Sequence, residues 1–405
     1  MNIAVIGGGA AGFFAAIHAK KNHPTSTVII FEKARKYLSK VKISGGGRCN
    51  VTNGCADVDE LCKAYPRGGK KLKKAFHLFN TTDTMKWFQS RGVPLVIQDD
   101  ACVFPVSQNS QSIIDCLVNE AQQLNISIKL GTGINGIEPI NQQLKLTFSK
   151  GGGEPQIFDK VIVATGGSPK RKGLVWLEAL QHKIEDPVPS LFTFNMPNES
   201  ITKLMGILVK ETLVNIQGTK LNADGPLLVT HWGVSGPAIL KLSAFGARIL
   251  SDTDYTFKIQ VNWVNEKNND TVLATLNGLT ETYAKKILAN IRPYFLPERL
   301  WLHLLERSNL SANKKWGELG RKSLNKLMTV LTNDAYAVKG KTTFKEEFVT
   351  CGGVSLESID LNTMQSKVCK NLYFAGEVMD IDAITGGYNF QAAWATGFIA
   401  GKLGD

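Results

Sequence analysis

The chain opens with Met1-Asn2-Ile3-Ala4-Val5-Ile6-Gly7-Gly8-Gly9-Ala10-Ala11-Gly12, an apolar run that leads into glycines at G-x-G-x-x-G spacing. A stretch typical of an apolar helix follows from Phe13 to Lys20, and a second apolar run, Val28-Ile29-Ile30-Phe31, ends in Glu32. Strand, glycine turn, helix, strand and terminal acid in this order form the fingerprint of a dinucleotide-binding unit. We therefore predict an α/β nucleotide-binding fold.

Each part of this fingerprint has a physical role. Gly7 allows the tight turn, Gly9 lets a pyrophosphate approach the backbone, and Gly12 lets helix and strand pack closely. The helix N-terminus offers free N–H groups and the positive end of its dipole to the phosphates. Glu32 can accept hydrogen bonds from a ribose diol, and its charge would repel a 2′-phosphate.

Two further glycine sites favour a flavin dinucleotide over NAD. Ala164-Thr165-Gly166-Gly167 follows the apolar run 160–164, where a second passage of the backbone past a cofactor needs residues without bulk. Near the C-terminus, Ala375-Gly376-Glu377 ends another apolar run, and Thr385-Gly386-Gly387-Tyr388-Asn389 opens a helix. A helix N-terminus at the flavin ring would stabilise the negative charge of its reduced form.

Composition is typical of a globular protein of two or three domains. The chain has 405 residues, of which 43% are hydrophobic and 20% charged, and no apolar run approaches the roughly 20 residues of a membrane span. The apolar start lacks the basic region of a signal peptide, so we expect none. The seven cysteines show no framework spacing, and we expect reduced thiols in a cytoplasmic protein.

The net charge of +12 is the unusual bulk property. Basic residues cluster within 33–42, 67–74, 170–172 and 314–326. Excess positive charge attracts polyanions, so two interpretations stay open: a basic surface that is only solvated, or a surface for an RNA-type partner.

The pattern changes along the chain and indicates an interrupted nucleotide domain. We expect the FAD-binding domain in two parts, 1–186 and 343–405, separated by an antiparallel β domain over 187–268 and a small helical domain over 269–342. Helices are expected over 271–291, 298–306 and 314–331.

Several motifs resemble the BaiN-like family of NAD(P)/FAD-dependent oxidoreductases, which includes aminoacetone oxidase and bile-acid dehydro-reductase relatives. The resemblance rests on Ser44-Gly45-Gly46-Gly47-Arg48-Cys49-Asn50, Thr52-Asn53, 164–167, Thr230-His231-Trp232-Gly233-Val234-Ser235-Gly236-Pro237 and 375–389. It implies a Rossmann-like two-dinucleotide-binding-domain flavoprotein with an inserted β-barrel-like domain and a small helical domain. One departure is Ala383, where the family pattern suggests glycine.

The resemblance also implies which residues hold FAD. The loop 7–12 and Glu32 would hold the adenosine half, and Glu377 with 380–389 the flavin half. The cofactor contacts that we expect are Gly7, Gly9, Ala10, Ala11, Gly12, Glu32, Lys33, Lys42, Gly45, Gly46, Arg48, Asn50, Ala164, Thr165, Gly166, Gly376, Glu377, Asp380, Gly386, Gly387, Tyr388 and Asn389. The fingerprint occurs once, so NAD(P)H would visit the flavin only transiently, as its reductant.

Two residues are candidates for the chemistry beside the flavin. Cys49 follows three glycines and could donate a proton or touch substrate, or could simply pack; with Cys55 its C-x5-C spacing differs from the C-x4-C of disulfide reductases. His231 lies in a turn, where it could donate a proton after hydride transfer or hold the turn. No set of Cys and His residues has the spacing of a zinc site, and we expect no metal.

Three functions remain open from the sequence. The first is reduction of a polarised C=C bond; the family includes enzymes thought to convert uridine to dihydrouridine in ribosomal RNA, and the basic helical region suits such a substrate. The second is oxidation of a small amine or reduction of a small enone. The third is an RNA-binding flavoprotein without turnover.

Overall fold

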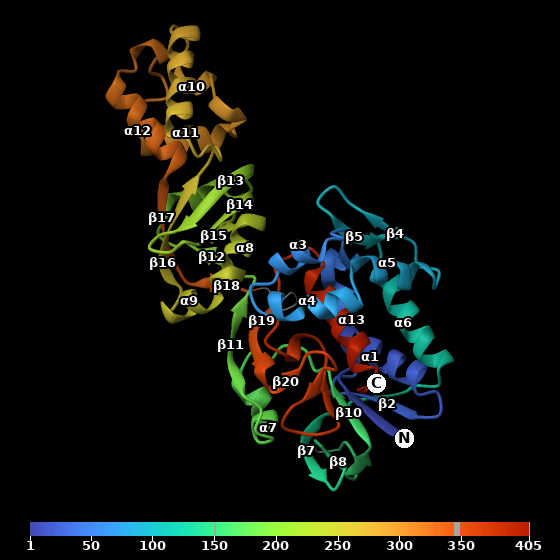
Figure 1. Ribbon diagram of the computed structural model, residues 1–405. Helices are drawn as coiled ribbons and strands as arrows, with labels where there is room; N and C mark the ends of the chain where they lie inside the picture. The colour runs from blue at the N-terminus through green and yellow to red at the C-terminus, as the bar shows by residue number, and fades with distance from the viewer. Residues whose placement is uncertain (150, 344–348, 405) are drawn as a thin grey trace. The chain divides into compact units, whose positions relative to one another are not determined.

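The computed structural model describes residues 1–149, 151–343 and 349–404. By its contacts the chain divides into two compact units (Figure 1). Unit 1 consists of Met1–Ser190 and Phe344–Asp405, and unit 2 of Leu191–Thr343. Each unit has a hydrophobic core of its own. In the described residues, no helix is long and apolar enough to cross a membrane.

Unit 1 is built on a mainly parallel sheet whose central strands, β1, β10 and β22, are largely buried. The strand order is β20-β21-β22-β10-β1-β2-β6, and the five strands from β22 to β6 pair in parallel. Their bounds are β1 Asn2–Ile6, β2 Thr27–Glu32, β6 Ser127–Leu130, β10 Lys160–Val163 and β22 Leu372–Phe374, with β20 Ile359–Asp360 and β21 Gln365–Ser366 at the antiparallel edge. Continuous apolar runs such as Ile3–Ile6 suit such a sheet, because helices or other layers cover both of its faces.

Two apolar helices, α1 (Ala10–Asn22) and α13 (Tyr388–Ala400), pack side by side in unit 1. Small residues allow the close approach: a Cβ on Gly401 would lie 2.7 Å from the Cβ of His18. The antiparallel strands β7 (Ile134–Ile140), β8 (Gln143–Phe148) and β9 (Gln156–Phe158) pack against the sheet through the ring of Phe31, which contacts Phe148 and Phe158.

The rest of unit 1 connects these layers. Its elements are α2 Ser39–Ile43, β3 Thr52–Asn53, α3 Val58–Lys63, α4 Gly69–Leu78, α5 Thr81–Gln89, β4 Leu95–Ile97, β5 Cys102–Pro105, α6 Gln111–Gln123, α7 Val175–Glu178, β11 Ile184–Ser190 and β19 Val349–Val354. β11 and β19 pair antiparallel, so the segments on either side of unit 2 form one ladder.

Unit 2 contains a seven-stranded antiparallel sheet in the order β17-β16-β13-β14-β15-β12-β18. The strands are β12 Thr193–Asn195, β13 Leu208–Ile216, β14 Asn222–Val229, β15 Gly233–Ser235, β16 Thr256–Asn262, β17 Asp334–Lys339 and β18 Lys341–Thr342, with helices α8 Pro237–Phe245 and α9 Ala247–Asp252 between them. Within the described residues the pairing is linear and does not close from β17 to β18.

A helical region enters unit 2 between β16 and β17 and contains α10 (Asn269–Thr282), α11 (Glu298–Arg307) and α12 (Arg321–Thr332). Buried Asp334 anchors it to the sheet, because its carboxylate accepts from Arg307 Nε at 2.7 Å and from Trp263 Nε1 at 3.0 Å. Helix and sheet residues share one core.

Two of the predicted helices were too long. The helix predicted over 271–291 ends at Thr282, and the one predicted over 314–331 begins at Arg321. The residues that follow α10 pair instead with the residues that precede α12. The Leu288 N–H donates to the Lys314 carbonyl at 2.8 Å, and the Trp316 N–H donates to the Lys286 carbonyl at 3.0 Å. Long-range pairing of this kind overrides local helical propensity.

Candidate functional site

The glycine loop between β1 and α1 lies at the carboxyl end of the parallel sheet. Gly7 has a φ of +115°, and a Cβ on it would lie 2.3 Å from the Ala164 carbonyl oxygen. A Cβ on Gly12 would lie 1.9 Å from the Gly7 oxygen. Gly9 differs, because a Cβ there would meet no atom of the described residues within 4 Å. Gly7 and Gly12 therefore serve packing, whereas Gly9 leaves open space beside the helix N-terminus.

Helix α1 presents free backbone donors toward this space. Its first backbone hydrogen bond runs from the Phe13 N–H to the Gly9 carbonyl at 3.0 Å, so the N–H groups of Ala10, Ala11 and Gly12 have no partner within the helix. In the part of the chain that the structure describes, no side chain caps this end and no acid lies in its first turn. Such an end attracts an anion.

Glu32, at the end of β2, lies directly beside the loop. Its Oε2 accepts from the Gly8 N–H at 2.7 Å, and its Oε1 accepts from the Ala34 N–H at 2.8 Å. A carboxylate has about four acceptor positions, so capacity for hydroxyl groups remains. Lys33 follows Glu32 and is exposed.

The second and third glycine sites reach the same edge of the sheet. Ala164 touches Gly7, as described, and the Ala375 N–H donates to the Val163 carbonyl at 3.0 Å. Gly376 approaches α1 so closely that a Cβ on it would lie 2.8 Å from the Cβ of Ala11. The structure thus brings together three segments that are far apart in sequence. Thr165 and Gly166 extend from the end of β10, and a Cβ on Gly166 would meet none of the described atoms within 4 Å.

Glu377 is held in place by partners that sequence reasoning did not name. Its Oε2 pairs with Lys40 Nζ at 2.9 Å, and its Oε1 accepts from the Thr350 N–H at 2.8 Å. Lys40 belongs to a basic cluster, but nothing in the sequence indicated which acid it meets. The buried Thr350 hydroxyl has no hydrogen-bond partner among the described residues, and it lies close to Gly167, whose Cβ position would be 2.6 Å away.

The N-terminus of α13 is joined to the Ser44–Asn53 region. Gly387 precedes the helix with a φ of +85°, and a Cβ on it would lie 2.2 Å from the Thr52 carbonyl oxygen and 2.8 Å from Asn50 Oδ1. The Asn53 side-chain amide donates to the Gly386 carbonyl at 3.0 Å. The first helical hydrogen bond runs from the Gln391 N–H to the Gly387 carbonyl at 3.0 Å. This helix therefore also begins with free N–H groups.

Asn389 has its side chain occupied within its own loop. Its Oδ1 accepts from the Ala383 N–H at 3.0 Å, and its Nδ2 donates to the Ala383 carbonyl at 3.1 Å. Asn389 therefore shapes the loop 383–389, and one hydrogen-bonding position remains on each of its Oδ1 and Nδ2 atoms. Ala383 does not have a positive φ, so alanine fits at this position. The Tyr388 carbonyl accepts from the Tyr65 hydroxyl at 2.6 Å.

Helices α1 and α13 run parallel to each other, and their N-termini are offset along the common direction. Gly397 packs against the backbone of Ala11 and Ala15, and Gly401 against Ala15 and His18. At a rise of 1.5 Å per residue, the start of α13 lies about 10 Å beyond the start of α1. Two free helix ends at this separation, with open space at Gly9, fit a ligand as long as FAD, whose pyrophosphate and flavin ring both favour such ends.

The Ser44–Asn50 segment makes its side-chain contacts mainly with residues 103–111. Gly45 and Gly46 have φ values of +56° and +68°. The guanidinium of Arg48 lies over the Phe104 ring at 4.1 Å, and Lys42 Nζ donates to Gln111 Oε1 at 3.0 Å. Asn50 Oδ1 accepts from the Val103 N–H at 3.2 Å. Cofactor contact by these side chains stays a prediction.

A buried ion pair next to the loop 383–389 was missed by sequence reasoning. Arg67 Nε donates to Asp382 Oδ1 at 2.5 Å, its Nη2 contacts Oδ2, and the Ser190 hydroxyl donates to Oδ2 at 2.7 Å. Asp382 is fully buried; burial raises the pKa of its carboxyl group, and Arg67 opposes that rise. Nearby Asp380 is half-buried, and its N–H donates to the Val354 carbonyl at 2.9 Å.

The structure argues against Cys49 as a catalytic residue. Its side chain is 0% exposed, and burial raises the pKa of its thiol to about 12. A side chain without exposed surface cannot touch substrate in this conformation. Its φ of +63° continues the turn of the preceding glycines. This conformation favours a packing role for Cys49, and a catalytic role stays a prediction.

His231 lies in unit 2, in the turn between β14 and β15, and is exposed. Its ring contacts Trp232 edge-on with centroids 4.4 Å apart, and Trp232 Nε1 donates to the Thr193 hydroxyl at 3.0 Å. The turn is thus held by Trp232, which leaves the imidazole accessible. Its role as a proton donor stays a prediction.

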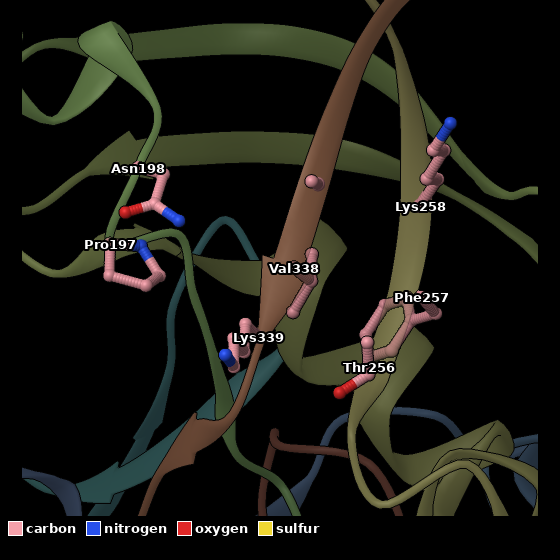
Figure 2. A pocket seen from close by; sticks show the side chains of 8 residues that line it. Pro197, Asn198, Thr256, Phe257, Lys258, Val338 and Lys339 are labelled. Atoms are coloured by element: carbon pink, nitrogen blue, oxygen red, sulfur yellow. The ribbon is translucent and has the colours of Figure 1, made fainter.

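Unit 2 also has a pocket of about 370 Å³ along β16 and β17 (Figure 2). Its lining residues are Pro197, Asn198, Thr256, Phe257, Lys258, Ala337, Val338 and Lys339. None of them is a predicted site residue. Within the described residues, no group of His, Cys, Asp and Glu side chains could hold a metal ion.

Comparisons with known proteins identify the family. The family model described as the HI0933-like protein Rossmann domain matches residues 1–403. The chain is 26% identical over 408 residues to the 3-dehydro-bile acid delta(4,6)-reductase of Clostridium scindens, covering 99% of this chain and 98% of that protein. It is also 26% identical over 403 residues to the ribosomal RNA dihydrouridine synthase of Haemophilus influenzae, covering 97% and 96%.

A solved structure supports the fold. The 3-ketosteroid-delta4-(5alpha)-dehydrogenase from Rhodococcus jostii RHA1 superposes with a TM-score of 0.50 at 12% identity, covering 98% of this chain and 96% of that one. With the matched family model, this confirms the Rossmann-like fold and the family predicted from the motifs. The chain belongs to the HI0933-like family of FAD-dependent oxidoreductases.

Proposed function

We propose that this chain reduces a polarised C=C bond and that its substrate is uridine in ribosomal RNA. The observation that carries the choice of RNA is charge: residues 191–343 contain 19 lysines and arginines against 12 aspartates and glutamates. An apolar small substrate needs no such excess, whereas RNA is bound largely through its phosphates. The name of the Haemophilus influenzae relative supports the same substrate.

Separate parts of the chain would bind separate parts of FAD. The loop at Gly9 and the end of α1 would hold the pyrophosphate, Glu32 the ribose, and the end of α13 the flavin ring. Bound FAD supplies hydride transfer, with NAD(P)H as the proposed source of electrons. Lys40 would orient Glu377 beside the cofactor, since the two groups form an ion pair at 2.9 Å.

Reduction of uridine to dihydrouridine also needs a proton. Hydride adds to one carbon of the C5=C6 bond and a proton to the other, so a general acid must reach the ring. We propose His231 for this role, because it is an exposed imidazole in a turn that Trp232 holds. The burial of Cys49 favours His231 over it for this role.

The test combines flavin spectroscopy with analysis of the RNA. The purified protein is reduced anaerobically and mixed with unmodified ribosomal RNA fragments, and dihydrouridine is measured as a gain of about 2 Da per nucleoside. We expect flavin reoxidation and dihydrouridine to appear together, and His231→Gln to slow both by about 100-fold or more. Reoxidation by oxygen alone, without modified nucleoside, would refute the RNA assignment.

A small enone is the second candidate, favoured by the name of the Clostridium scindens relative. A steroidal dienone in the same assay distinguishes the two. Saturating turnover of the dienone, together with no modification of the RNA, would establish this alternative. The basic charge would then serve solubility only.

A further inference from the structure

Unit 2 carries one aromatic side chain that projects fully into solvent. Phe295 has an exposed fraction of 101%, while its neighbours Pro293 and Leu296 are buried. Both Tyr294 and Phe295 have left-handed backbone, with φ values of +55° and +54°. This conformation disfavours bulky residues, so buried contacts on both sides must hold it.

The loop around Phe295 is anchored to the helices next to it. The Tyr294 hydroxyl donates to the Thr275 hydroxyl on α10 at 3.3 Å. Pro297 precedes α11 and further restricts the chain. The Phe295 ring is therefore presented on a constrained loop.

The surrounding segment is strongly basic. Residues 283–331, the basic helical segment, contain ten lysines and arginines and three acids. Arg307 pairs with buried Asp334. The other nine cations form no ion pair among the described residues, and all but Lys314 are exposed, including Arg292 and Arg299 on either side of Phe295.

We propose that the basic helical segment binds RNA and that Phe295 stacks on an unpaired base. This inference rests on the proposed RNA substrate and adds the element that recognises it. Exposed cations contact phosphates of any sequence, whereas an exposed ring gains most by stacking on a base whose face is free. Bases within a duplex have no free face, so the chemistry selects a loop, bulge or single strand.

Charge favours RNA over an apolar protein partner at this surface. The nine cations that form no ion pair within the described residues would repel each other under a neutral partner, and desolvating them there would be unfavourable. Phosphates neutralise them and release bound counterions. The experiment must accordingly distinguish RNA binding at this surface from binding of a protein partner.

The experiment measures binding of the full-length holoprotein to two fluorescent RNAs by anisotropy, over a series of salt concentrations. One RNA is a hairpin with a uridine-rich loop, and the other is a duplex of equal length. The variants are Phe295→Ala, Phe295→Trp and the double variant Arg321→Gln/Lys322→Gln. Phe245→Ala is the matched control, since Phe245 is exposed on α8, outside this segment.

We expect Phe295→Ala to weaken hairpin binding by about 5- to 150-fold, the loss of one stacked base, while duplex binding changes little. Phe295→Trp and Phe245→Ala should bind like the wild type. The Arg321/Lys322 variant should weaken both RNAs and reduce the salt dependence.

Three results would overturn the inference: wild-type protein that does not bind the hairpin, unchanged hairpin affinity in Phe295→Ala, or equal losses on hairpin and duplex. Unchanged affinity would show that the Phe295 ring does not stack on a base of the hairpin. Hairpin binding that depends on Phe295, in a protein that forms no dihydrouridine, would refute the proposed function and leave this inference standing.

Discussion

Gly9→Ala tests whether the open space beside α1 holds the cofactor phosphates. Gly9 has φ and ψ of −93° and −170°, a conformation that alanine adopts freely, and an added Cβ would meet none of the described atoms within 4 Å. We therefore expect the apoprotein to fold normally, with its free energy of unfolding changed by less than about 1 kcal/mol. The added methyl group would stand in the space left for the phosphates.

The expected effect falls on cofactor affinity. Loss of one charge-assisted backbone hydrogen bond is worth about 1.5–3 kcal/mol, which corresponds to roughly a 10- to 150-fold higher Kd for FAD. The assay is titration of apoprotein with FAD, followed by flavin fluorescence, with thermal unfolding of the apoprotein as the check on folding.

Gly12→Ala is the contrasting variant. A Cβ there would lie 1.9 Å from the Gly7 carbonyl oxygen, so the turn itself must deform. We expect this variant to be destabilised even without FAD. Wild-type FAD affinity in a folded Gly9→Ala protein would refute the placement of the phosphates.

Three further predictions concern buried groups. Burial lowers the pKa of His18 to about 3. Below pH 6.5 the unfolded chain therefore binds a proton at this residue that the folded chain does not bind. The free energy of unfolding should consequently be about 1.4 kcal/mol lower at pH 5.5 than at pH 7.5. Urea denaturation should show that His18→Phe removes this part of the pH dependence, and an unchanged slope would contradict the argument. Arg67→Met should destabilise the protein by about 3–5 kcal/mol, because it leaves Asp382 buried without its cation, and adding Asp382→Asn should recover part of that loss in the same measurement. Cys49→Ala should retain turnover near the wild-type rate, and a loss of about 100-fold or more would restore Cys49 as a catalytic residue.

Sequence reasoning did best where a structural requirement is local. The order of strand, glycines and acid in residues 1–32 predicted the first βαβ unit, and the structure pairs β1 with β2 in parallel as expected. Gly7 and Gly12 could be identified because each has a local constraint: Gly7 has a positive φ, and a Cβ on Gly12 would collide with the Gly7 carbonyl oxygen. The family resemblance extended this to the whole chain.

Long-range contacts set the limits of that reasoning. Cys49 follows three glycines, which suggested a residue at the flavin, but its side chain turns into the core. Arg67 looked like one member of a basic cluster, and only the fold places it against Asp382, 315 residues later. Lys40 with Glu377 is a similar case.

The local pattern of apolar runs and glycines was sufficient for the nucleotide-binding fold and favoured a flavin over NAD, because turn geometry and strand burial depend on neighbouring residues. The partner of each charged group, the exposure of Phe295 and the burial of Cys49 came from the folded chain alone. These properties depend on which distant segments of the chain contact each other. The burial of a side chain and the partner of a charged group are determined only once those segments have packed.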